Sequence, residues 1–308
     1  MKRGWILIGW LVLALFAHAQ NTLEIGLHGG LAGWNSQHSY VSTKPGLTAG
    51  LHLAYAYYSP YVIGFRLGLT ADMHQAGWRK TDYTDSYTTI DVENETMQID
   101  YTIGSLSEMH TIWSVGIPAQ IAFKKNHFGF YIGPKVVFPL AATWTEKAQN
   151  AALSVYYPDY ENRVYESYPL AASRAFEMSN NGKAKLPKIQ WWLAAEISYD
   201  IPFQTYSKHK SGLTVGIYAD YCFTPNTNSS DLQPSLIMLT DTRDGFPLSR
   251  ILSSVLAAEH QSKPLVTSYR LFDVGLKLSY FFSPAPKHSH RHTRSSSHSV
   301  YPCRCAYW

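Results

Sequence analysis

Apolar side chains alternate with small or polar ones over long stretches of this 308-residue chain. Alternation with a period of two is typical of a β-strand whose two faces meet different surroundings. Eight segments carry the pattern, at residues 23–34, 46–58, 61–72, 110–124, 128–142, 188–203, 212–224 and 268–282. The sequence therefore predicts an all-β fold built from eight long strands.

The two faces of these segments differ in kind. One face is almost purely apolar, as in Phe65, Leu67 and Leu69 of the third segment. The other face carries Gly and Ala, together with His28, His52 and isolated charges. The charged residues of this face are Glu24, Arg66, Lys135, Glu196, Asp220, Asp273 and Lys277. In a soluble sandwich the apolar face would form the core and the polar face would meet water. The two faces alone therefore do not distinguish a soluble sandwich from a membrane barrel, and the connections between the segments provide the distinction.

The connections between the segments alternate between short and long. The short ones cover residues 59–60, 124–127 and 204–211, and the long ones cover 73–109, 143–187 and 225–267. Short turns at one end and long loops at the other are typical of outer-membrane barrels, in which closure leaves no backbone group unpaired in lipid. We therefore predict a closed, antiparallel, up-and-down transmembrane β-barrel of eight strands, with long extracellular loops and short periplasmic turns.

Two local features bear on the strand count and regularity. Residues 81–103 have the pattern of a further hairpin, and the alternative is therefore a ring of ten strands. Pro118 and Pro134 fall inside predicted strands, where proline removes a hydrogen bond from the ladder. They predict bulges in the fourth and fifth strands.

Aromatic residues with the parity of the apolar face gather at the strand ends. Beside the short turns and the last strand end lie Tyr57, Tyr61, Phe123, Phe128, Tyr199, Tyr280 and Phe282, and beside the long loops lie Trp113, Trp144, Trp191 and Phe223. Two such belts are what amphipathic rings form at the two interfaces of a membrane. Trp34 has a fitting height but the opposite parity, and we exclude it.

The first 20 residues have the features of an export signal. Lys2 and Arg3 precede an apolar run over residues 5–16, and Ala17-His18-Ala19 fits the small-x-small cleavage pattern. The run is shorter than the roughly 20 apolar residues of a membrane-spanning helix, although an uncleaved anchor is the alternative. We predict a cleaved signal peptide at residues 1–19, a barrel at 20–282 in a Gram-negative outer membrane, and a disordered periplasmic tail at 283–308.

The formal charge of +4 does not indicate a nucleic-acid partner. Six basic residues lie in the signal and the tail: Lys2, Arg3, Lys287, Arg291, Arg294 and Arg304. The other 20 basic residues face all 22 acidic ones, so the strand region is slightly acidic.

Three stretches resemble the small outer-membrane β-barrel proteins of the OmpA-like or PorT-like kind found in Bacteroidetes-type bacteria. They are the hairpin from Gly116-Ile117-Pro118-Ala119-Gln120 to Gly129-Phe130-Tyr131-Ile132-Gly133-Pro134-Lys135, the last strand Val274–Phe282, and a signal that ends Ala-His-Ala-Gln. The resemblance implies that the last strand is the signal read by the barrel assembly machinery, with Gly275, Tyr280 and Phe282 as its marks. The 26 residues after Phe282 are too few for the peptidoglycan-binding domain that OmpA-like proteins often carry.

An eight-stranded barrel has an interior that side chains fill. We therefore expect the seven charged residues of the polar face to pair with one another as a lumen polar network, because an isolated buried charge is costly. The alternative is a proton or ion path. Neither a nucleophile elbow nor a Gly-rich phosphate loop occurs, so the sequence predicts no enzyme and no cofactor.

Function is expected to lie in the long connections and the tail. Residues 79–100 are acidic, residues 153–170 are rich in tyrosine, and residues 248–258 have the spacing of a short amphipathic helix. For the first two, the alternative is that strands simply extend above the membrane. In the tail, His288, His290 and His292 are weak candidates for a metal site, and a disordered polar tail is the alternative.

The pattern as a whole favours a structural or surface-recognition role through the long loops. The alternatives are an accessory subunit of an envelope secretion or motility machine, which the PorT-like resemblance implies, a small channel, or a lipid-modifying barrel enzyme. The expected partners are outer-membrane lipids, the barrel assembly machinery, and envelope proteins or extracellular ligands.

Overall fold

The computed structural model describes residues 20–36, 41–59, 62–90, 94–160, 162–164, 176–203, 210–227, 235–240, 248–254, 258–259, 263–264, 266 and 268–283. Among them, no helix is long and apolar enough to cross a membrane.

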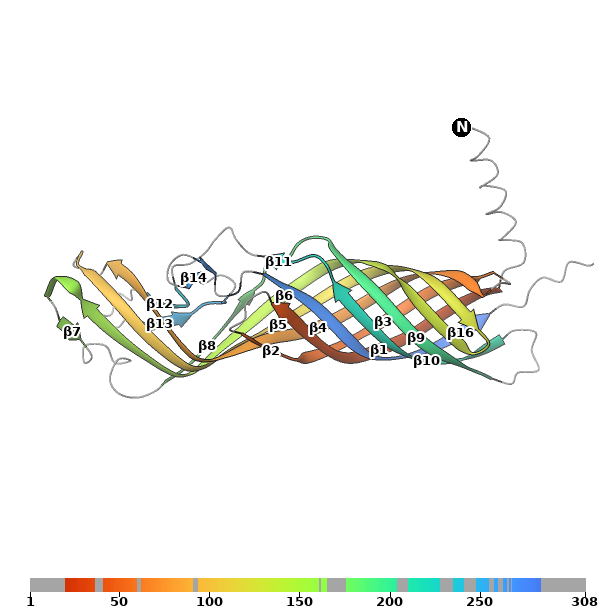
Figure 1. The fold of residues 1–308 in the computed structure, drawn as a ribbon, viewed down its shortest axis with the longest axis horizontal. Coiled ribbons are helices and arrows are strands. Elements are labelled where there is room, and N and C mark those ends of the chain that lie inside the picture. Colours follow the sequence, from red (N-terminus) through yellow and green to blue (C-terminus); the bar gives the residue numbers. More distant parts are fainter. Residues whose placement is uncertain are drawn as a thin grey trace, which may run out of the picture.

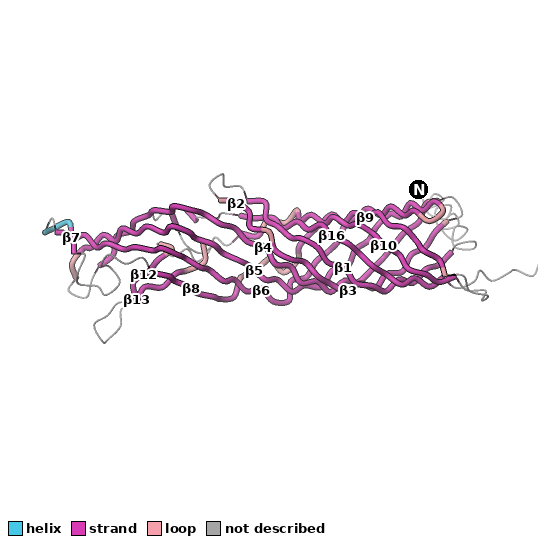
Figure 2. The backbone as a smooth tube through the Cα atoms, turned by 90° about the horizontal axis from the view of Figure 1, so that it is seen from below, coloured by secondary structure: helices cyan, strands magenta, loops and turns pink. Residues whose placement is uncertain are grey.

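Eight long strands form a closed ring in which every neighbouring pair is antiparallel. In ring order they are β1 (Gln20–Ser36), β3 (Gly46–Tyr58), β4 (Ile63–Ile90), β5 (Thr96–Lys125), β6 (Phe128–Tyr157), β9 (Gln190–Pro202), β10 (Lys210–Cys222) and β16 (Ser268–Ser283). The ring closes where β1 pairs with β16, from Leu23 opposite Phe282 to Ser36 opposite Tyr269. Figures 1 and 2 show the resulting cylinder, and the prediction of an eight-stranded up-and-down barrel is confirmed.

The closing seam requires glycine. Gly30 lies opposite Gly275, and a Cβ atom on Gly30 would stand 2.1 Å from the carbonyl oxygen of Val274. A Cβ atom on Gly275 would stand 2.2 Å from the carbonyl oxygen of Gly29. The two strands therefore approach more closely here than any side chain allows.

Each strand of the cylinder turns its apolar face outward. Leu51, Ile217 and Leu276 are 64%, 60% and 66% exposed, and every one of the eight strands contributes exposed large apolar residues. The polar face points into the lumen. This arrangement inverts that of a soluble sandwich, in which the apolar face would be buried.

The connections at the two ends of the cylinder differ. At one end β5 and β6 join through a tight turn in which Asn126 has a φ of 56°. At the other end β4, β5 and β6 continue as one sheet, and β4 pairs with β5 as far as Ile90 opposite Thr96. Residues 81–90 and 96–103 thus pair as predicted for a hairpin, but they lengthen strands already in the ring, so the alternative of ten strands is wrong. Much of the long loops expected over 73–109 and 143–187 is strand that extends beyond the barrel, at residues 73–90, 96–109, 143–157 and 176–183.

We call this extension the head (Figure 1). It comprises β4 after Gln75, β5 before Thr111 and β6 after Thr143, together with short elements beside them. These short elements are β2 (Ser42–Lys44), η1 (Pro158–Tyr160), β7 (Asn162–Val164), β8 (Phe176–Lys183), β12 (Ile237–Thr240), β13 (Leu248–Ile251), β14 (Ala258–Glu259) and β15 (Lys263–Pro264). The short β11 (Asn226–Thr227) pairs with β16 at the barrel rim.

The head has its own hydrophobic core. Tyr101, Leu106 and Ile99 from β5 pack with Leu236 and Ile251, and none of these five is more than 2% exposed. The helix expected over 248–258 is wrong at its start, because Leu248–Ile251 is a strand paired with Ile237–Thr240. A neighbouring strand edge satisfies the backbone there, and residues 255–257 lie outside the described part of the chain.

A bulge at Leu140 reverses the inward and outward faces of β6. Ser114 pairs with Pro139 whereas Trp113 pairs with Ala141, so Leu140 has no partner on β5. Residues with even numbers point outward before the bulge and inward after it. No register shift occurs at Pro118 or Pro134, so the bulges predicted there are wrong.

A second reversal crosses the whole head sheet. Asp82, Gly104 and Asn150 lie in one row across β4, β5 and β6. Asp82 and Asn150 have φ values of 51° and 55°, in the left-handed region that Asp and Asn tolerate better than most residues. Beyond this row the odd-numbered residues point into the core.

Candidate functional site

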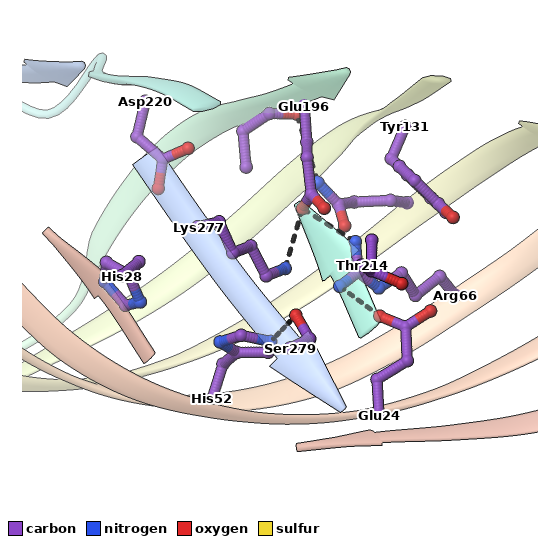
Figure 3. Close-up of polar contacts among 12 residues, drawn as sticks. Glu24, His28, His52, Arg66, Tyr131, Glu196, Thr214, Asp220, Lys277 and Ser279 are labelled. Carbon is purple, nitrogen blue, oxygen red and sulfur yellow. Dashed lines mark hydrogen bonds and ion pairs between the residues drawn. The ribbon is translucent and has the colours of Figure 1, made fainter. Parts of the chain in front are cut away.

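Arg66 is the centre of a buried ionic cluster in the barrel lumen. Its guanidinium donates to Glu196 Oε2 at 2.7 Å and to Glu24 Oε2 at 2.6 Å. Lys277 Nζ donates to the same Glu196 oxygen at 2.7 Å (Figure 3). The ring of Tyr131 lies 4.5 Å from the guanidinium carbon. Two carboxylates thus meet two cations, which is the arrangement that makes buried charge tolerable.

A second cluster lies nearer the head. Lys135 Nζ lies 2.9 Å from Asp72 Oδ2 and 3.0 Å from Asp220 Oδ2. His28 Nε2 lies 3.1 Å from Asp72 Oδ1. These contacts link β4, β6, β10 and β1 across the lumen.

The structure brings the seven predicted lumen residues into these two clusters, except that Asp273 meets a residue outside the predicted set. Asp273 Oδ2 lies 3.0 Å from His74 Nδ1. Asp72 and His74 were missed as partners because Asp72 stands at the end of its predicted segment and His74 lies just beyond it. Their even-numbered parity, shared with Arg66, was the available signal.

The space left between the clusters is small. A cavity of about 50 Å³ is lined by His28, His52, Gln120, Glu196, Tyr218 and Lys277, among others. A water molecule needs roughly 10–15 Å³ of such space, so the cavity has room for a few waters. With the ionic clusters on either side, this geometry favours a plugged lumen over a diffusion pore.

Most of the predicted interface aromatics point outward in the structure. Phe128, Trp191, Trp113 and Phe223 are more than half exposed. Phe123, Tyr199, Tyr280 and Phe282 are exposed to a lesser degree, Tyr57 is half-buried, and Tyr61 lies outside the described residues. Gly275, Tyr280 and Phe282, the expected assembly signal, lie on β16 at the closing seam.

Trp144 does not belong to the outer belt. It is only 5% exposed, because the bulge at Leu140 turns it into the head. Trp34 also points inward, where its ring stacks on Tyr269 at 3.9 Å and lies edge-on to His110 at 4.6 Å. These rings pack in the core at the base of the head.

Glu108 and Glu146 form a buried carboxyl pair in the head. They lie opposite each other on β5 and β6, and neither is exposed at all. The bulge at Leu140 creates this pair, since without it Glu146 would point outward.

The two carboxyl groups differ in pKa, and the pair holds its proton on Glu146 rather than on Glu108. Burial raises the pKa of Glu146 well above its ordinary value, and the neighbouring negative charge of Glu108 raises it further. Burial also opposes ionisation of Glu108, but the neutral Glu146 carboxyl, the His110 ring and Ser254 outweigh burial and hold its pKa at about 2. Glu108 is therefore the member of the pair that ionises first, and Glu146 is the member that keeps the proton.

Glu108 accepts hydrogen bonds that hold a distant part of the chain against the head sheet. Ser253 Oγ donates to Glu108 Oε1 at 2.9 Å, and the backbone N–H of Ser254 donates to Glu108 Oε2 at 2.8 Å. His110 contacts the same carboxylate and also the hydroxyl of Tyr269. No pattern in the sequence pointed to Glu108, because its partners are about 145 residues away.

The metal candidates His288, His290 and His292 lie outside the described residues. Within the part of the chain that the structure describes, no group of three or more His, Cys, Asp or Glu side chains is arranged to hold a metal ion.

No protein-family model matches the chain. No curated protein matches it either. Among solved structures it is similar to Ail, the attachment invasion locus protein of Yersinia pestis, with 9% identity and a TM-score of 0.29 over 86% of this chain and 99% of that chain. It is similar to OprG from Pseudomonas aeruginosa, with 11% identity and a TM-score of 0.29 over 86% and 96% of the two chains. Neisserial surface protein A gives 10% identity and a TM-score of 0.27 over 85% and 97%.

Similarities this low carry no argument, so the assignment of the barrel rests on the chain's own strand pairing. The OmpA-like or PorT-like resemblance stays a prediction.

Proposed function

We propose that this protein is an outer-membrane barrel that presents its head as a recognition surface outside the cell. The observation that carries the proposal is the continuation of β4, β5 and β6 from an apolar cylinder into a polar-faced sheet with its own core. The cylinder supplies the anchor and the head supplies the surface.

The exposed apolar band supports the membrane placement. All eight strands expose large apolar side chains over the cylinder, while the charges point into the lumen. Water would make such a surface a severe aggregation hazard, whereas lipid accommodates it. Closure of the ring pairs the strand edges, as a membrane requires.

The outer face of the head supports a role in recognition. Thr84, Thr88, Thr96 and Thr102 are exposed there on a sheet backed by the hydrophobic core. A surface held rigid by such a core loses little conformational entropy when it binds a partner. The plugged lumen disfavours a channel, and the proposal includes no catalytic role.

Cysteine labelling on intact cells tests the orientation. In separate variants, Thr88→Cys places a thiol on the head and His127→Cys places one at the opposite turn. A membrane-impermeant maleimide is expected to label the first and to leave the second unlabelled until the cells are opened. The reverse result would overturn the proposal. A gel shift on boiling reports whether each variant is folded.

A second measurement tests recognition. The outer-face variant Thr88→Glu/Thr96→Glu/Thr102→Glu changes the surface of the head and leaves its core alone. Gentle detergent extraction of tagged whole-length protein, with quantitative mass spectrometry, is expected to show partners with the wild type that the variant loses. A stoichiometric set of envelope proteins among them would favour the machine-subunit alternative. Identical sets for both proteins would contradict recognition through this face.

A further inference from the structure

Basic side chains form a strip on the outside of the molecule where the head begins. Arg79 on β4, Lys147 on β6 and Lys183 on β8 are all exposed, and we call these three residues the basic strip. Strand β8 pairs with β6 along the side of the head (Figure 2). The strip therefore lies on one continuous sheet surface.

The strand register sets the spacing of the strip. Arg79 and Lys147 both lie opposite Ser107, so the three residues form one row across β4, β5 and β6. Two strand spacings of about 4.8 Å separate the two cations by about 10 Å. Lys183 lies opposite Thr143, four residues along β6 from Lys147, or about 14 Å.

No carboxylate interrupts the strip on its own face. The other outward side chains between the row of Thr143 and the row of Lys147 include no acid in the described residues, and Lys44 among them is basic: Ser42, Lys44, Gln75, Ser107, Met109, Thr111, Thr143, Thr145, Ser179 and Asn181. Glu108 and Glu146 belong to the same rows but point inward and are not exposed. Asp82 and Glu177, which are exposed, come only in the rows beyond.

The height of the strip narrows the choice of partner. On β6 the last large apolar residue facing outward is Leu140, which is 70% exposed. Lys147 is seven residues further along, about 24 Å of strand and, at a tilt of about 40°, about 18 Å above the apolar band. The headgroup layer of a phospholipid leaflet is only about 5–8 Å thick. Lys183 stands near that layer, whereas Arg79 and Lys147 stand above it.

We propose that Arg79, Lys147 and Lys183 form a binding surface for the phosphate groups of lipopolysaccharide in the outer leaflet. A glycolipid that carries phosphates on a deep saccharide headgroup matches both rows of the strip, and a phospholipid matches only the lower one. Ser107, Thr145 and Asn181 lie among the cations as hydrogen-bonding groups for phosphate or sugar oxygens. The inference rests on the proposed function, because it requires the head to face outward.

The test is a titration of purified whole-length protein in detergent with lipopolysaccharide. The neutralised variant Arg79→Gln/Lys147→Gln/Lys183→Gln changes the net charge by the same amount as the outer-face variant, which serves as its matched control. We expect the neutralised variant to bind at least about tenfold more weakly and the control to stay within about threefold of the wild type. Binding to the wild type is expected to weaken with added salt.

Two further ligands identify the source of the phosphate. Lipopolysaccharide stripped of phosphate is expected to bind the wild type as weakly as intact lipopolysaccharide binds the neutralised variant. Vesicles of phosphatidylglycerol are expected to bind the wild type and the neutralised variant within about threefold of each other, because they reach only the lower row. Equal lipopolysaccharide binding by the wild type and the neutralised variant, or an equal loss with the control, would overturn the inference.

The labelling of Thr88→Cys on intact cells separates this inference from the proposed function. If the head is not labelled, the proposed function itself fails. If the head is labelled and lipopolysaccharide does not distinguish the variants, only the phosphate-binding surface fails.

Discussion

Glu108 lies directly opposite Glu146 on the neighbouring strand, and both carboxyl groups are fully buried in the head. Two ionised carboxylates cannot share such a site, so Glu146 stays protonated while Glu108 accepts hydrogen bonds from Ser253 and Ser254. The attachment of this loop segment to the sheet therefore depends on one proton.

Replacing Glu146 is expected to remove a pH dependence from the head. The raised pKa of Glu146 means that its contribution is most favourable below its ordinary value of 4.5. As the pH rises from there to the raised pKa, the unfolded chain ionises first and the folded head loses stability. Glu146→Gln is expected to abolish this loss and to stabilise the head at pH 8 by about 1–3 kcal/mol. Amide hydrogen exchange of β5 and β6 at several pH values, corrected for intrinsic exchange rates, measures this change in the stability of the head.

The matched control for that change is Glu108→Gln. Glu108 has a lowered pKa, so the stability that its carboxylate contributes is present above pH 4.5 and is lost as the pH falls toward about 2. Its replacement is expected to weaken the hold on Ser253 and Ser254 at neutral pH. If both variants shift exchange protection in the same direction at pH 8, the unequal sharing of the proton is wrong.

Deleting Leu140 is expected to leave both the barrel and the head folded. Ala141, which already lies opposite Trp113, would then follow Pro139 directly, and unbroken alternation would keep Trp144, Glu146 and Ala148 facing inward. The folded band on a gel should survive, and the head should resist protease as well as it does in Leu140→Ala, which retains the bulge. A deletion variant whose head is sensitive to protease would contradict the assignment of Leu140 as the extra residue of β6.

Two adjacent glycines of β1 are expected to respond differently to the same change. An alanine Cβ at position 30 would lie 2.1 Å from the carbonyl oxygen of Val274, whereas at position 29 the nearest atom is 3.5 Å away. Gly30→Ala is therefore expected to cost about 1–3 kcal/mol of unfolding free energy, and Gly29→Ala very little. Urea unfolding in lipid vesicles measures both. Similar costs for the two variants would mean that the seam is not as tight as described.

Arg66→Met is expected to lower barrel stability by about 3–5 kcal/mol, because it leaves buried Glu24 and Glu196 without their shared cation. The temperature at which the folded gel band disappears reports the change. Adding Glu24→Gln to Arg66→Met should recover part of the loss, because Glu196 still pairs with Lys277. An unchanged melting temperature for Arg66→Met would mean that the cluster adds nothing to stability.

The cylinder could be predicted from the sequence because its physical cause is local. Each strand residue meets either the outside or the lumen, and a period of two in residues such as Phe65, Arg66 and Leu67 records that choice directly. The inward charges could be predicted as a set for the same reason. The pairing of individual charges could not be predicted, because residues such as Asp72 and Lys135 belong to different strands and meet only when the ring closes.

The head could not be predicted, because it depends on partners far along the chain. Leu248–Ile251 has the spacing of a helix face, yet the edge of Ile237–Thr240 makes it a strand. Trp144 has the parity of the outer belt, yet one unpaired residue at Leu140 turns it inward.

Alternation along each strand is thus enough to specify the closed barrel, its outward apolar band and its polar lumen from the sequence. The sheet that the long connections form, its core, and the meeting of Glu108 with Glu146 inside it depend instead on how distant strands pair in the folded chain. A register shift of a single residue exchanges the two faces of a strand, and such a shift is set by pairing between strands.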